Sequence, residues 1–163
     1  YDKQTCQELQ RIGNEALRDG DAAACQLAQP SGLAFDGYRL WFVDAESSSL
    51  RYVENAKVKT AVGEGLFRCG DAIQGELLLY TPAALHIGII GDGCGGGRPF
   101  ITDTYNNKIK VYSPDDGAMF CILENLHEPA GIAKKTCSLY IADTNAHRIL
   151  RFDLQEMTAY PFV

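Results

Sequence analysis

The stretch LYIADTNAHRILRF at residues 139–152 decides the fold, because the chain contains the same pattern three times. The other two copies are LWFVDAESSSLRYV at 40–53 and PFITDTYNNKIKVY at 99–112. Each copy has an apolar run rich in β-branched and aromatic residues, an Asp, a polar stretch and a second apolar run. The pattern predicts two antiparallel strands joined by a tight turn.

A proline upstream of each copy extends the repeat. The proline and the Asp are 14 residues apart in the first and third copies and 21 apart in the second, the pairs being Pro30–Asp44, Pro82–Asp103 and Pro129–Asp143. The seven additional residues match the glycine-rich stretch GDGCGGG at 91–97, which we interpret as an inserted loop. The second copy also lacks the glycine that follows the proline in the other two.

Further apolar runs complete each copy. One follows the hairpin, at 58–62, 118–123 and 157–162, and another strand is expected directly after each proline. The prolines are 52 and 47 residues apart, and four strands per unit at such spacings are typical of β-propeller blades. We therefore predict an all-β fold of about three four-stranded antiparallel blades plus a strand of a fourth, arranged as a partial ring.

The expected organisation is a single propeller domain, or a fragment of one, over residues 1–163. Its parts are an outer strand and connector at 1–29, a blade and connector at 30–80, and blades at 81–126 and 127–163. The connector pattern RDGDA at 18–22 recurs as RCGDA at 68–72. A short helix at 22–27, capped by Asp21, is expected in the first connector.

The motif P-x-G-[LI]-A, followed by Asp and a polar turn, resembles the NHL-repeat β-propellers from Ala28 to the end of the chain. The connector and the sequence AVGEGLF at 61–67 are similar to the branch that carries a thioredoxin-like domain upstream. The resemblance implies a non-catalytic module for protein–protein interaction or scaffolding. It leaves open whether the chain is part of a longer array, whether two chains associate to complete a ring, or whether the blades form an open arc.

Composition and charge restrict the class of partner. Among 163 residues, 46% are hydrophobic, and 15 Lys and Arg stand against 21 Asp and Glu, which gives a net charge of −6. This composition excludes intrinsic disorder. It makes nucleic acid an unlikely partner, because non-specific binding to phosphates requires a basic surface. The longest apolar stretch, at 77–90, is interrupted by polar residues and proline, so no membrane span is expected.

The six cysteines form no C-x-x-C pair and no zinc-binding spacing. We therefore expect reduced thiols and a cytoplasmic location. Cys94, in the glycine-rich stretch, is the thiol expected to be most exposed. No Cys or His next to it in sequence would lower the pKa of its thiol, so the sequence does not predict a reactive cysteine.

Asp44, Asp103 and Asp143 recur at one position of each copy, which favours a structural role over a catalytic one. Each carboxylate is expected to accept backbone N–H groups one to three residues further on and to close the turn. Asn106, Asn107 and Asn145 are expected to adopt the left-handed conformations that such turns require. The set is therefore predicted to consist of turn residues.

Arg51, Lys110 and Arg151 follow the turns and are expected on one exposed blade face, although Arg151 is one position later than the other two. The simplest interpretation is a solvated surface. The alternative is a contact surface for an anionic peptide or RNA.

Other candidate sites are weaker. The G-x-G-x-x-G pattern at 91–96 is followed by Arg98-Pro99 and a predicted strand, so the helix N-terminus of a dinucleotide site is missing. His86, His127 and His147 occupy non-equivalent positions in the copies, which disfavours a metal centre. The sequence therefore predicts no catalytic residues, metal or cofactor. Two alternatives to the interaction module remain, a propeller lyase or hydrolase with a metal in the central channel and an RNA-binding NHL module.

Overall fold

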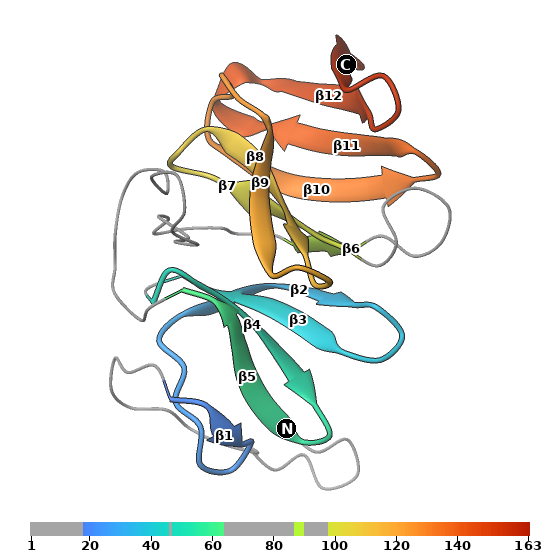
Figure 1. The fold of residues 1–163 in the computed structure, drawn as a ribbon. Coiled ribbons are helices and arrows are strands. Elements are labelled where there is room, and N and C mark those ends of the chain that lie inside the picture. The colour runs from blue at the N-terminus through green and yellow to red at the C-terminus, as the bar shows by residue number, and fades with distance from the viewer. Residues whose placement is uncertain (1–17, 46, 64–86, 90–97) are drawn as a thin grey trace, which may run out of the picture.

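The computed structural model describes residues 18–45, 47–63, 87–89 and 98–163. These residues form three antiparallel sheets, one for each copy of the repeat (Figure 1). The first sheet has the order β1-β5-β4-β3-β2, with β1 Gly20–Asp21, β2 Pro30–Phe35, β3 Leu40–Asp44, β4 Ser49–Glu54 and β5 Lys57–Val62.

The other two sheets have four strands each. The second has the order β6-β7-β8-β9, with β6 Ile87–Ile89, β7 Pro99–Asp103, β8 Lys108–Ser113 and β9 Ala118–Leu123. The third has the order β10-β11-β12-β13, with β10 Pro129–Lys135, β11 Ser138–Asp143, β12 Arg148–Asp153 and β13 Thr158–Pro161, and the 3₁₀ turn η1 Thr144–Ala146 precedes β12. The prediction of four-stranded antiparallel blades is confirmed.

The proline and the Asp of the repeat are strand partners. Pro30 pairs with Asp44, and Pro129 pairs with Asp143, which explains the constant separation in the first and third copies. The pairing register shifts between Ser31 and Leu33, at Gly32, whose φ of 52° is left-handed. A glycine relieves the steric cost of that conformation, so this part of the motif marks a β-bulge.

The turn after each Asp has four residues, and its last residue is left-handed in all three sheets. The φ angles are 47° at Ser48, 58° at Asn107 and 53° at His147. Of the three asparagines expected to take this conformation, Asn107 does so, whereas Asn106 and Asn145 have negative φ. The geometry belongs to the position in the turn, and the sequence fills that position with three different residues.

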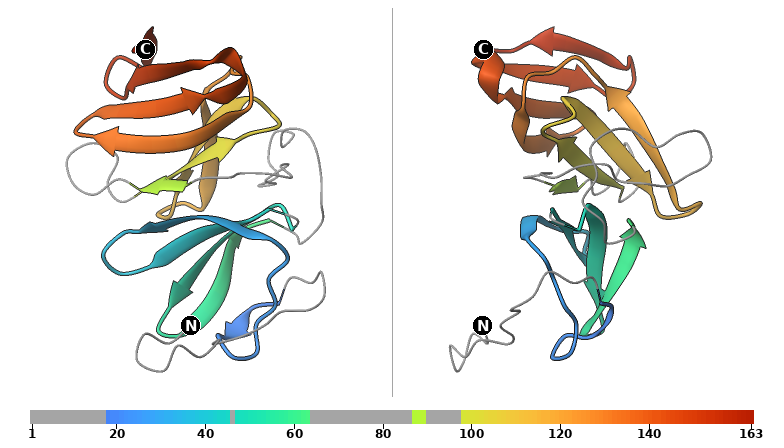
Figure 2. Two further views of the ribbon diagram at one scale, coloured as in Figure 1. Left: turned by 180° about the vertical axis from the view of Figure 1, so that it is seen from behind. Right: turned by 90° about the vertical axis from the view of Figure 1, so that its left-hand side faces the viewer.

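The sheets stack face to face as successive layers (Figures 1 and 2). The first and second sheets share an apolar cluster of Trp41, Val43, Leu50, Val62, Ile101 and Tyr112. The second and third share a larger cluster of Phe100, Ile109, Val111, Leu126, Leu139, Ile141, Leu150 and Phe152. The first strands β2, β6 and β10 lie side by side. Each sheet is therefore stabilised by burial against its neighbour, as repeat architectures require.

The helix expected at 22–27 is absent. The N–H groups of Ala24 and Cys25 donate to the carbonyl of Asp21 in a single turn, and Gln26 then pairs back with Arg18. Because Gly20–Asp21 pairs with β5, the chain reverses immediately and has no room for a helix.

Several predicted features lie outside the described residues. They include residues 1–17 of the predicted outer strand and connector, the second connector copy at 68–72, Pro82, His86 and the loop at 91–97 with Cys94. Within the part of the chain that the structure describes, no helix has the length and apolarity needed to cross a membrane.

Candidate functional site

Asp44 connects the end of β3 to the segment that precedes β2. Its side chain is fully buried, and it accepts hydrogen bonds from the backbone N–H groups of Ala28, at 2.9 Å, and Gln29, at 2.6 Å. These amides lie 15 and 16 residues upstream, immediately before Pro30. The carboxylate therefore fixes the entry of the chain into the blade, whereas the sequence predicted that it would hold the amides of the turn that follows it.

Arg51 neutralises Asp44 and holds the first connector. Its guanidinium is fully buried and lies 2.9 Å from Asp44. It also donates to the carbonyls of Gln26, at 2.7 Å, and Arg18, at 3.0 Å, and to the carboxylate of Asp19, at 3.0 Å. One cation thus joins β3, β4 and residues 18–26. A buried ion pair is tolerated when further hydrogen bonds satisfy most of its donors, and here both terminal nitrogens of Arg51 are paired while the buried Nε has no partner among the described residues.

Asp19 carries this network to the outer strand of the first sheet. It accepts the hydroxyl of Thr60, at 2.7 Å, and the backbone N–H of Thr60, at 2.8 Å. Burial alone would raise the pKa of Asp19, but the hydrogen bonds from Thr60 and Arg51 outweigh it, so the pKa lies below its usual value.

The third sheet repeats the arrangement with a different cation. Asp143, fully buried, accepts the backbone N–H of His127 at 2.5 Å, again two residues before the proline. Arg148 lies 2.8 Å from the same carboxylate. Leu150 occupies the strand position that Arg51 has in the first sheet. The cation that pairs with the carboxylate therefore stands at a different position of the strand in the third sheet, although the carboxylate makes the same backbone contact.

The second sheet has a related but incomplete network. Asp103 lies 2.7 Å from the ammonium of Lys110 and accepts a hydrogen bond from the Asn106 amide at 3.2 Å. Burial raises the pKa of Asp103, and Lys110 only partly opposes this effect. The Oδ1 atom of Asp103 is buried and has no hydrogen-bond partner in the described chain. This is the copy whose proline spacing differs.

The three basic residues predicted to line an exposed face do not do so. Arg51 and Lys110 are 0% and 5% exposed and are paired with the repeated carboxylates, so that prediction is wrong for both. Arg151 is half-buried, with its guanidinium 5.3 Å from the centre of the Tyr160 ring. For Arg51 the sequence could not show this burial, because alternation along a strand does not reveal that the connector at 18–29 covers that side chain.

The other candidate groups do not assemble into a reactive site. His127 is exposed, with Nδ1 4.0 Å from Asp143, and His147 lies in the turn before β12. Among the described residues there is no group of three or more His, Cys, Asp or Glu side chains that could hold a metal ion.

The expected redox state of the cysteines is wrong in one place. Cys25 and Cys121 are thiols, but Cys137 is disulfide-bonded. Burial raises the pKa of both described thiols, which disfavours their reactive thiolate forms. The expected cytoplasmic location was inferred partly from reduced cysteines. The disulfide at Cys137 therefore weakens the argument for that location.

An apolar patch lies on the first sheet, on the face turned away from the second. Ala34 packs against the cluster between these sheets, so its neighbours Leu33 and Phe35 point the other way and are 67% and 64% exposed. Together with Tyr38 and Leu40 they form what we call the first-sheet patch. Exposed apolar surface of this kind marks interaction sites.

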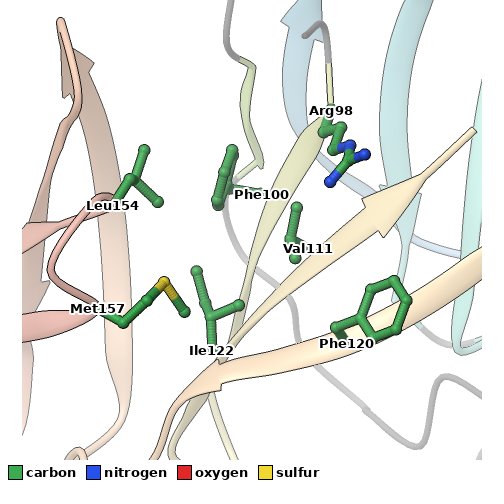
Figure 3. Close-up of a pocket in the computed structure, with 7 residues that line it drawn as sticks. All are labelled: Arg98, Phe100, Val111, Phe120, Ile122, Leu154 and Met157. Atoms are coloured by element: carbon green, nitrogen blue, oxygen red, sulfur yellow. The ribbon is translucent and has the colours of Figure 1, made fainter. Parts of the chain in front are cut away.

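A second apolar feature is a cavity of about 430 Å³ between the second and third sheets. We call it the rim cavity, and it is lined by Arg98, Phe100, Val111, Phe120, Ile122, Leu154 and Met157. Figure 3 shows Leu154 and Met157 facing the residues of β7, β8 and β9 across the cavity. The sequence could not predict it, because its two walls come from segments more than 30 residues apart and neither wall has a motif.

Comparisons with known proteins place these sheets in a wider context. No family model matches the chain. NHL repeat-containing protein 2 of Bos taurus is 31% identical, over 98% of this chain and 26% of that protein. The human protein of the same name is 30% identical, over 94% of this chain and 25% of that protein. SUPPRESSOR OF QUENCHING 1, a chloroplastic protein of Arabidopsis thaliana, is 30% identical, over 79% of this chain and 14% of that protein. The chain thus spans about a quarter or less of these relatives.

Solved β-propeller structures share the fold. A streptogramin B lyase superposes with a TM-score of 0.60 and 16% identity, covering 85% of this chain and 42% of that one. A chain of a nidogen/laminin complex superposes with a TM-score of 0.63 and 19% identity, covering 82% of this chain and 48% of that one. At these identities the likeness concerns the fold, and it confirms the predicted propeller blades.

Proposed function

Because this chain belongs to the NHL-repeat β-propeller family, we propose that it acts as a non-catalytic module that binds another protein through apolar surface. The observation that carries the proposal is the rim cavity. Its floor residues Phe100 and Val111 are 2% and 7% exposed, whereas Phe120 and Met157 at its mouth are 47% and 54% exposed. A largely apolar hollow with an accessible aromatic rim is the kind of surface that anchors a partner's side chain.

The repeated charges support the same proposal. In the first two sheets the basic residue after the turn is buried against its carboxylate and is not available to a ligand. An RNA-binding role would need exposed cations, and Arg151 is the only one of the three predicted basic residues that retains solvent contact. The lyase alternative rests on structural neighbours at 16% and 18% identity, and a likeness of that degree concerns the fold. The interaction module is therefore the function that we propose.

Self-association is a second candidate, favoured by the first-sheet patch. Leu33 and Phe35 sit on a sheet face, and sheet faces in this fold pack against further sheets. A second copy could supply such a sheet and extend the ring. A thioredoxin-like domain next to the propeller, outside this chain, is the setting that the family resemblance implies.

Affinity capture tests the protein-binding proposal. The immobilised chain is incubated with extract of the cells that express it, and bound proteins are quantified by mass spectrometry. The double variant Phe120→Asp/Met157→Asp should lose a partner that the wild type retains, and Tyr105→Asp, an equally exposed residue at the far end of the β7–β8 hairpin, should retain it. Equal recovery on all three proteins, with every variant folded by thermal melting, would contradict the proposal.

A further inference from the structure

The rim cavity is open along the outer edge of the second sheet. Phe120 and Ile122 alternate along β9, so both project into the cavity from the outermost strand. On the other side of β9, no described residue pairs with it. The cavity therefore lies next to a strand edge that no described residue pairs with.

The first sheet shows what such an edge can accept. Its strand β5 is equivalent to β9, and β1 pairs antiparallel with the outer side of β5, with Gly20 opposite Val58 and Asp21 opposite Lys57. Main-chain hydrogen bonds at a sheet edge supply affinity without requiring a particular sequence. This fold thus already contains one extended segment of two residues docked at the outer edge of a blade.

Arg98 gives the cavity its polar group. It lies immediately before β7 among the apolar lining residues, and it forms no hydrogen bond or ion pair with a described residue. Hydrogen bonds from the Ser113 side chain and the Ala118 N–H lower the pKa of Asp116, an exposed residue in the β8–β9 turn, and the charge of Arg98 adds a smaller effect in the same direction. A guanidinium beside apolar walls favours a carboxylate, with which it can form two parallel hydrogen bonds.

We propose that β9 and the rim cavity bind an extended peptide segment of a protein partner. The segment pairs with the edge of β9, places one large apolar side chain among Phe100, Phe120 and Ile122, and sets an adjacent Asp or Glu against Arg98. This inference rests on the proposed protein-binding function and specifies its site and the chemistry of the partner. A peptide fits better than an enclosed small molecule, because the cavity opens along a strand edge that offers backbone donors and acceptors.

Selection from a phage-displayed library of random peptides tests the site. The wild-type chain should enrich peptides in which a large apolar residue neighbours an acidic one. Phe120→Asp/Met157→Asp should bind the selected peptides about tenfold or more weakly in fluorescence anisotropy, and Tyr105→Asp should bind them as the wild type does. Unchanged affinity in the double variant would show that the cavity is not the peptide site. It would leave the proposed protein-binding function intact if the wild-type chain still captures a partner.

Two further variants test the chemistry. Arg98→Gln should still select apolar residues but lose the acidic preference, and retention of that preference would contradict the role of Arg98. Phe120→Pro and Cys121→Pro each remove one backbone N–H group of β9. Successive N–H groups of a strand point to opposite sides, so one of the two points to β8 and the other to the outer edge. The variant that keeps wild-type melting should lose peptide binding, and full binding by that variant would exclude strand addition.

Other occupants would appear as distinct outcomes. Cys121 is the register equivalent of Thr60, which contacts Asp19 at 2.7 Å, and the sequence places Cys69 where Asp19 stands in the connector pattern. Rapid cross-linking of Cys69 to Cys121 by diamide would assign the edge to the chain's own connector and overturn the proposal. Dodecanoate is the probe for a small amphipathic acid. If it binds tightly, displaces the selected peptides and depends on Arg98 but not on β9, the site binds such an acid and the peptide proposal is wrong.

Discussion

Asp44 and Arg51 lie 2.9 Å apart with both side chains completely buried, and together they hold the segment through which the chain enters the first blade. The equivalent carboxylate in the third blade, Asp143, holds the equivalent segment through the N–H of His127. In the first and third sheets the Asp of the repeat thus links the blade to the segment that precedes it. In the second sheet the described partners of Asp103 are Lys110 and Asn106.

The first prediction concerns the strength of this fastening. Asp44→Ala removes the only fully buried counter-charge of Arg51 and leaves it the half-exposed Asp19, so it should reduce the free energy of unfolding by about 3–5 kcal/mol. Asp143→Ala should cost less, about 1–3 kcal/mol, because its cation Arg148 is 41% exposed and regains water. Urea denaturation measures both. Equal costs, or a cost at Asp143 larger than that at Asp44, would contradict the account.

The second prediction concerns pH. The pKa of Asp19 is lowered in the folded protein, so its contribution to stability is present above its ordinary value of 3.8 and is lost as the pH falls through the lower folded value. The difference in unfolding free energy between the wild type and Asp19→Asn should be constant from about pH 5 to 7 and shrink below about pH 4. A difference that grows on acidification would show that the sign is wrong.

The third prediction concerns the left-handed turn position. His147 has a φ of 53° and an exposed side chain, and Asn occupies the equivalent position in the second sheet. His147→Asn should raise the free energy of unfolding by about 0.5 kcal/mol, whereas His147→Val should lower it by about 1 kcal/mol or more, because a β-branched residue is strained there. Thermal melting compares the two variants. The same melting temperature for both would argue against backbone strain at this turn.

The fourth prediction concerns the first-sheet patch. Light scattering over a concentration series should show mass increasing with concentration for the wild type, and Leu33→Glu/Phe35→Glu should abolish the increase. Phe120→Asp/Met157→Asp serves as the control, because it alters the other apolar surface. A monomer at all concentrations, or the same increase in mass for the Leu33/Phe35 variant, would show that the chain does not self-associate through this patch.

The hairpins could be predicted from sequence because each is encoded locally. The apolar run that ends in Asp44 forms β3, and the run after its turn forms β4, as the alternation indicated. Burial of Arg51 could not be predicted in the same way. Its partners Arg18, Asp19 and Gln26 belong to a connector 25–33 residues upstream, and local patterns carry no information on that contact.

The helix expected after Asp21 failed for a related reason. Helix propensity favoured residues 22–27, but pairing of Gly20–Asp21 with β5 and the hydrogen bonds of Arg51 to the connector carbonyls gave the extended arrangement more partners. The rim cavity also escaped prediction. Phe120 and Met157 became neighbours through stacking of two sheets, and no sequence pattern specifies which turn of one blade faces which strand of the next.

The central claim is that this module binds through apolar surface while its repeated charges serve the fold. Calorimetry of a partner recovered by capture tests it most directly, at two temperatures and at two salt concentrations. The account predicts a negative heat-capacity change and an affinity that varies little with salt. An affinity that falls steeply with salt, with no heat-capacity change and with loss of binding in Arg151→Ala, would show that binding is electrostatic and would contradict the claim.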